Sequence, residues 1–188
     1  VSHQLYNEEP SEYLLTESAP GDPSIEYDLA IIEFDDQGAF WKVEQLEDTL
    51  ELIRRRNAES ERGILVLPYA HGWKNNADPE QQTGDLPKFR RNLWSIAKRI
   101  KDGENGRADR VVGVYLGWRG ATSRLPVQEQ LTFWDRRATA ERVASLAMRE
   151  TLFRLMGVTQ ENPGSKCYIV GHSMGGLVIG KTLSPSLM

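Results

Sequence analysis

This sequence of 188 residues has a single cysteine, no long apolar run and no strong excess of either charge. Its one cysteine, Cys167, excludes an internal disulfide framework and a metal site made of several cysteines. No apolar run approaches the ~18 residues that a membrane-spanning helix needs. The 23 basic and 27 acidic side chains give a net charge of −4, which argues against nucleic acid or an anionic membrane as the main partner.

The start of the chain has neither an initiator methionine nor the basic and apolar segments of a secretory signal. We therefore expect a cytoplasmic protein that has been processed or excised from something longer. With 39% hydrophobic and 27% charged residues, the composition is that of an ordinary globular domain, and the chain is long enough to bury a core without disulfides.

Strand and helix patterns alternate along most of the chain. Residues 1–24 are polar and rich in proline, and we expect them to form an irregular arm. Short apolar or β-branched runs predict strands over 25–34, 64–67, 110–116 and 166–170, and helical periodicity covers 42–58, 86–101, 133–156 and a segment from 176 onward. This alternation predicts one α/β domain over 25–188, with a mostly parallel sheet flanked by helices.

Two residues are expected to mark helix ends. Asp85 stands directly before an apolar helical stripe, as an N-cap does, and Gly157 follows the predicted helix over 133–156, as a C-terminal cap does. Right-handed crossovers would bring the loops that follow the parallel strands to one edge of the sheet. Ligands bind at that edge in such folds. It would collect the loops that begin at His71, Gly117 and Gly171.

The segment Gly171-His172-Ser173-Met174-Gly175 matches the pattern G-x-S-x-G. It follows an apolar strand and precedes a helical pattern, which is the setting in which this motif presents a nucleophilic serine. A turn this tight needs glycine because side chains at 171 and 175 would strike the neighbouring strand and helix. The amide of Met174 would lie in the first helical turn, where it can stabilise an oxyanion.

A second oxyanion donor is expected from the segment His71-Gly72-Trp73, which follows another buried strand. Gly72 allows the backbone to bend so that the amide of Trp73 points toward the oxyanion. Loss of one such donor typically costs ~3–4 kcal/mol in the transition state.

Together, HGW followed by KNN after one strand and GHSMGG after a later one resemble the α/β-hydrolase superfamily, and most closely its serine esterases and lipases. The resemblance covers about residues 25–188. It implies Ser173 as the catalytic nucleophile, the amides of Trp73 and Met174 as the oxyanion hole, and hydrolysis of a small-molecule or lipid ester. It implies no metal and no organic cofactor.

The catalytic base and its acidic partner are not evident in this sequence. A serine hydroxyl needs a base at neutral pH, and in this superfamily an Asp or Glu and then a His follow the nucleophile. No Asp, Glu or His follows Ser173, and we expect His71 and His172 to pack locally, with His3 in the polar arm. We therefore expect a fold truncated after the nucleophile turn, inactive or weakly active alone, with an uncovered sheet edge available for self-association.

Several alternatives remain open at this point. His71, His172, Trp118 and Arg119 are candidates for a substrate pocket, but packing is an equal alternative for Trp118 and a surface ion pair for Arg119. The chain as a whole is either a hydrolase or a non-catalytic binding protein that keeps the hydrolase fold. An acyltransferase or a thioesterase with the same nucleophile is a further alternative.

Overall fold

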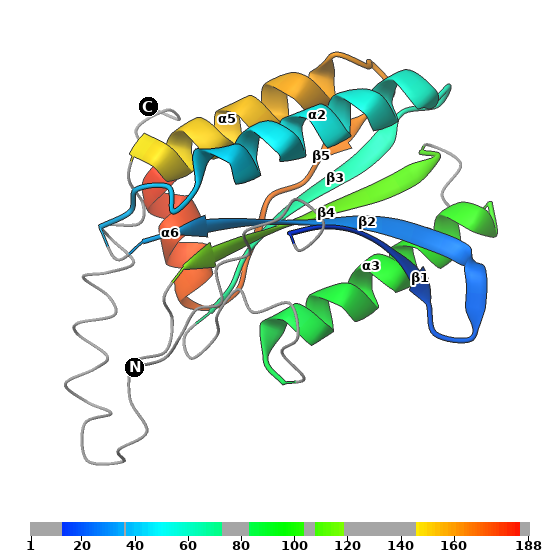
Figure 1. The fold of residues 1–188 in the computed structure, drawn as a ribbon, viewed down its shortest axis with the longest axis horizontal. Helices are drawn as coiled ribbons and strands as arrows, with labels where there is room; N and C mark the ends of the chain where they lie inside the picture. Colours follow the sequence, from blue (N-terminus) through cyan, green and yellow to red (C-terminus); the bar gives the residue numbers. More distant parts are fainter. Residues whose placement is uncertain (1–12, 36, 73–82, 104–107, 119–145, 185–188) are drawn as a thin grey trace.

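The computed structural model describes residues 13–35, 37–72, 83–103, 108–118 and 146–184. These residues form a mixed sheet flanked by helices (Figure 1). The strands are β1 (Leu14–Ala19), β2 (Asp22–Phe34), β3 (Ile64–Ala70), β4 (Arg110–Trp118), β5 (Lys166–Cys167) and β6 (Val170–Gly171). The helices are α2 (Val43–Glu59), α3 (Asp85–Lys101), α5 (Leu146–Gln160) and α6 (Met174–Leu183).

The sheet has the order β1-β2-β4-β3-β5, with β6 also paired to β3. Only the β1–β2 pair is antiparallel, and the other pairs are parallel. The expected α/β architecture with a mostly parallel sheet is therefore confirmed. The central strands β3 and β4 are continuous apolar runs in the sequence. In β4 nearly every residue is buried, and in β3 buried residues alternate with partly buried ones.

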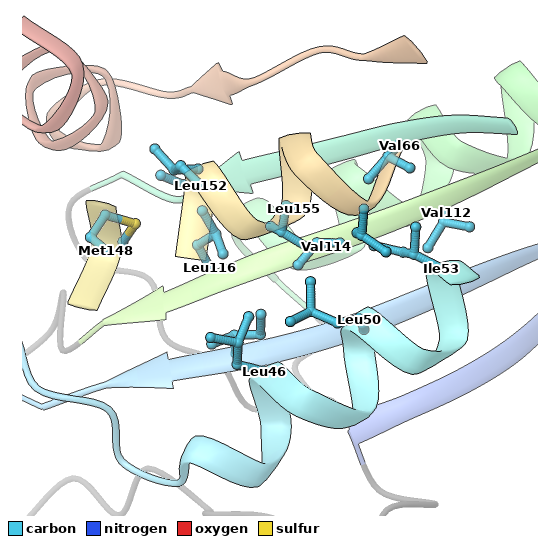
Figure 2. Packing of buried hydrophobic residues seen from close by; sticks show 14 of the residues in the cluster. Leu46, Leu50, Ile53, Val66, Val112, Val114, Leu116, Met148, Leu152 and Leu155 are labelled. Carbon is cyan, nitrogen blue, oxygen red and sulfur yellow. The ribbon is translucent and has the colours of Figure 1, made fainter. Parts of the chain in front are cut away.

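Two hydrophobic cores lie on opposite faces of the sheet. Side chains alternate along β2, so that Ala30 and Ile32 join one core while Leu29 and Ile31 join the other. Helices α2 and α5 cover the first face and α3 covers the second (Figure 1). In Figure 2, apolar side chains of α2 and α5 pack over those of the central strands, among them Leu46, Leu50, Ile53, Val112, Val114, Leu152 and Leu155.

The expectation of an irregular arm is wrong for the described part of residues 1–24. Strand β1 occupies 14–19, and β2 begins at 22, so the expected domain boundary falls inside a strand. The two strands join through Gly21, whose φ of 84° permits the tight turn, and Thr16 donates a hydrogen bond to Asp28 across the pair. This strand was missed in the sequence because polar side chains occupy its exposed positions and hide the apolar pattern.

Helix α5 does not end at Gly157 but continues to Gln160. The helix continues because Val158 is buried in the core and the side chain of Asn57 hydrogen-bonds the carbonyl of Val158 at 2.8 Å. The part of the predicted helix at 133–145 lies outside the described residues. The predicted strand at 166–170 is split into β5 and β6, although the Tyr168 amide still donates to Val66 and keeps the chain beside β3.

In the described ranges, no helix has the length and apolarity to cross a membrane. The same ranges contain no group of three or more His, Cys, Asp or Glu side chains arranged to hold a metal ion.

Candidate active site at the carboxyl edge of the sheet

The register of the sheet aligns the end of β3 with the end of β6, so the loops that begin at His71 and after Gly171 start next to each other. Ala70 at the end of β3 is paired with Leu116 of β4 on one side and with Gly171 of β6 on the other. The amide of His172 then donates to the carbonyl of Ala70 at 3.0 Å. The segments that follow β3 and β6 therefore leave the sheet side by side, at its carboxyl edge.

Ser173 occupies a sharp turn between β6 and α6. Its backbone angles are φ 54° and ψ −117°, and no other non-glycine residue of the described ranges has a positive φ. Such a conformation costs of order 1–3 kcal/mol and is found preferentially at functional sites. The residue is exposed, and its hydroxyl has no hydrogen-bond partner among the described residues.

The glycines around Ser173 are required by close backbone contacts. A Cβ at Gly171 would lie 2.6 Å from the backbone of Gly176, and a Cβ at Gly175 would lie 2.1 Å from the carbonyl oxygen of Ala70. Position 171 therefore faces the following helix and position 175 faces the end of β3. These are the two clashes that the sequence predicted.

The amide of Met174 begins helix α6. The next two amides, of Gly175 and Gly176, donate to the carbonyls of His172 and Ser173 at 2.8 and 3.0 Å. Within the described residues, no acceptor is found for the Met174 amide. An unsatisfied N–H at a helix N-terminus carries partial positive charge and can bind an oxyanion.

Gly72 lies directly against the turn at Ser173. A Cβ at Gly72 would be 2.8 Å from Nδ1 of His172 and 3.1 Å from Cβ of Ser173. The backbone of the predicted oxyanion segment therefore reaches the predicted nucleophile. Trp73 and Arg119, the next residues of the two neighbouring loops, lie outside the described residues.

His71 is fully buried and uses both of its ring nitrogens. Nδ1–H donates to the carbonyl of Gly72 at 2.9 Å, and Nε2 accepts from the amide of Trp118 at 2.9 Å. Burial lowers the pKa of His71 to about 4, so the ring is neutral at physiological pH. Because neither nitrogen is available, His71 holds the two loops together and cannot accept the proton of Ser173.

Trp118 is fully buried beneath the same loop. Its ring lies parallel to that of His71, with centroids 5.3 Å apart, and its indole N–H donates to the carbonyl of His71 at 3.1 Å. Neither ring offers accessible surface to a substrate in this structure, and packing accounts for both.

His172 and Asp85 form a contact that the sequence did not indicate. The His172 side chain is 54% exposed, and its Nδ1–H donates to Oδ2 of Asp85 at 2.8 Å. The amide of Gly72 donates to the same oxygen at 2.8 Å. The prediction that Asp85 is the N-cap of α3 is wrong. Gly84 takes that position, and Asp85 is the first helical residue.

The Asp85 carboxylate is ionised although its side chain is only 2% exposed. Burial by itself would raise its pKa, but the hydrogen bonds from the Gly72 amide and from His172 outweigh burial and lower it. In sequence terms Asp85 signals only the beginning of a helix, since its partners are distant in the chain.

No family model, curated protein or solved structure matches this chain. What the site can do chemically follows from its own residues. An exposed serine hydroxyl on a strained turn, beside an unsatisfied helix N-terminal amide, is suited to attack a carbonyl carbon and to stabilise the resulting oxyanion.

Proposed function

We propose that this protein is a serine hydrolase that cleaves carboxylic esters or related acyl bonds through Ser173, on an α/β-hydrolase-like fold. The observation that carries the proposal is the backbone of Ser173. With its positive φ, the exposed Ser173 forms a sharp turn at the carboxyl edge of the sheet, and the neighbouring Met174 amide has no acceptor among the described residues. A serine in an ordinary helical turn would have neither property.

The proposed reaction begins with attack of Ser173 Oγ on the acyl carbonyl. The amides of Met174 and Trp73 stabilise the developing oxyanion. Its collapse breaks the ester C–O bond, the alcohol leaves with a proton from the base, and an acyl-serine remains; water then hydrolyses it, which releases the acid and restores Ser173. The Ser173 proton must pass to a base. The nitrogens of His71 are both occupied, and no hydrogen bond joins Ser173 to a histidine within the described ranges. The proposal therefore assigns the base to a group that does not contact Ser173 here.

Chemical rescue tests this function. Hydrolysis of p-nitrophenyl acetate is measured with and without added imidazole, which can act as the missing base, for the wild-type protein and Ser173→Ala. We expect the wild type to exceed the variant, and imidazole to widen the difference because it accepts the serine proton. Equal rates for two folded proteins under both conditions would reject the proposal. The variant also corrects for the reaction that imidazole catalyses by itself.

A non-catalytic interaction protein with the same fold is the second candidate, and one observation favours it. Strands β5 and β6 pair with β3 only, and no described strand covers their other side. Tyr168 and Val170 are 59% and 44% exposed along this edge. An uncovered edge with apolar side chains is suited to pairing with another chain, including a second copy of this one.

A further inference from the structure

Asp85 holds a negative charge inside the protein where the segment after β3 meets the turn at Ser173. Its Oδ2 accepts one hydrogen bond from the Gly72 amide and one from His172, each at 2.8 Å. A single oxygen atom therefore connects the two segments that would supply the oxyanion donors and the nucleophile. Hydrogen bonds to an ionised acceptor are stronger than those between neutral groups.

These two bonds act on backbone that is already in close contact with Ser173. A Cβ at Gly72 would lie 3.1 Å from Cβ of Ser173, so the two residues are in close contact. A shift of Gly72 relative to Ser173 would therefore change the geometry at the reacting hydroxyl. Reaction rates in an enzyme site are sensitive to small displacements of the reacting groups.

A role in capping helix α3 does not explain these contacts. The N-cap of α3 is Gly84, which has no side chain to cap the helix, and Asp85 is the first helical residue. The Oδ2 of Asp85 instead reaches two segments outside the helix. Among the described lysine and arginine residues, Lys88 pairs with Asp85: its Nζ is 3.9 Å from Oδ1, and its side chain is 62% exposed. An exposed pair of this kind contributes little.

We propose that Asp85 is a positioning residue, whose carboxylate fixes the Gly72 backbone and the His172 ring against Ser173 and so sets the reactivity of that serine. This inference rests on the proposed function. It adds a residue outside the motifs around positions 71 and 173.

The test compares three variants of the full chain. Asp85→Ala removes both bonds, and Asp85→Asn keeps the shape and one acceptor oxygen but removes the charge. Asp28→Asn is the matched control, because Asp28 is also a fully buried carboxylate but binds Arg56 and Arg110 far from the site. For each variant, the rate of Ser173 labelling by a fluorophosphonate is measured per folded molecule, together with hydrogen exchange of the Gly72 amide by NMR.

We expect Asp85→Ala to slow labelling on the order of 10- to 100-fold and to speed exchange of the Gly72 amide, with Asp85→Asn between it and the wild type. Asp28→Asn should lose stability but keep both properties. If folded Asp85→Asn and Asp85→Ala label at the wild-type rate, the positioning role is rejected while the serine hydrolase stands. If the wild type itself does not label at Ser173, the proposed function fails. In that case, an unchanged hydrogen-exchange rate of the Gly72 amide in Asp85→Ala would still show that Asp85 does not fix the Gly72 backbone.

Discussion

Two histidines flank the site, and their hydrogen bonds give them different roles. His71 is buried, with Nδ1 bonded to the Gly72 carbonyl and Nε2 to the Trp118 amide. His172 is half exposed and bonded to Asp85 through Nδ1 only. The first therefore belongs to the scaffold beneath the loops, whereas the second lies at the surface beside Ser173.

The state of the His71 ring can be predicted from these bonds. Its partners require a neutral ring with the proton on Nδ1, and its pKa is lowered to about 4. An unfolded histidine titrates near ~6.5, so the stability that depends on neutral His71 is complete above that pH and is lost as the pH falls toward 4. Nitrogen-15 NMR of the imidazole should show the Nδ1–H tautomer and no titration above pH ~5. Titration near the ordinary value would contradict the buried, doubly bonded ring.

Residue identities predicted only the part of the site that local sequence controls. The glycines at 171 and 175 were predicted because a tight turn between strand and helix needs them, and they make the close contacts expected. Asp85 was missed because its bonds depend on where two distant loops meet. The same limit applied to Trp118. Its stacking on His71 depends on the register of two strands that are far apart in the sequence, so the sequence alone did not distinguish a packing role from a pocket role.

Two of the three glycines of helix α6 have contrasting surroundings. Gly175 faces the end of β3, where a Cβ would be 2.1 Å from the Ala70 carbonyl oxygen, whereas Gly180 is exposed and a Cβ there would meet nothing within 4 Å. The first contact fixes how closely the helix approaches the sheet, and with it the position of Ser173.

We therefore expect Gly175→Ala to destabilise the protein by about 1–3 kcal/mol, because either the helix or the strand must move. Gly180→Ala should instead stabilise it by about 0.5–1 kcal/mol, through the higher helix propensity of alanine. Denaturant unfolding of both variants measures the two effects. A Gly175→Ala protein as stable as Gly180→Ala would show that α6 does not approach β3 as closely as described.

At the level of whole elements, local sequence patterns were a good guide where they reflect burial in the core. The apolar runs predicted β3 and β4, and the helical stripes predicted α2 and α3 to within a few residues. Strand β1 was missed because a partly exposed edge strand carries many polar side chains. The end of α5 was misplaced because its last turn is held by Asn57, a contact from another helix that no local pattern reveals.

The molecule as a whole has two sheet edges with different protection. On one side, β1 covers β2 in an antiparallel pair. On the other, β5 and β6 are short, and the exposed Tyr168 and Val170 lie along them. The exposed apolar residues therefore lie at the edge of the sheet formed by β5 and β6, and Ser173 directly follows β6.

If this edge mediates self-association, a charge on it should prevent pairing. We expect the wild type to form dimers or larger species in analytical ultracentrifugation, and Tyr168→Lys to shift it toward monomer, because lysine on an edge strand opposes pairing. Val43→Lys is the control, since Val43 is an exposed apolar residue at the start of α2, with 46% of its surface accessible. A monomeric wild type at high concentration, or equal effects of both lysines, would reject the edge as the interface.

The central claim is that the backbone around Ser173 makes its hydroxyl a nucleophile. The most direct measurement is mass-spectrometric mapping of fluorophosphonate adducts on the full chain over a range of alkaline pH, where hydroxide can take the serine proton. We predict that Ser173 is modified far faster than every other serine, that its rate rises with pH and with added imidazole, and that unfolding the protein removes the difference. Adducts spread evenly over the serines of the folded protein, with Ser173 no more reactive than the rest, would contradict this account.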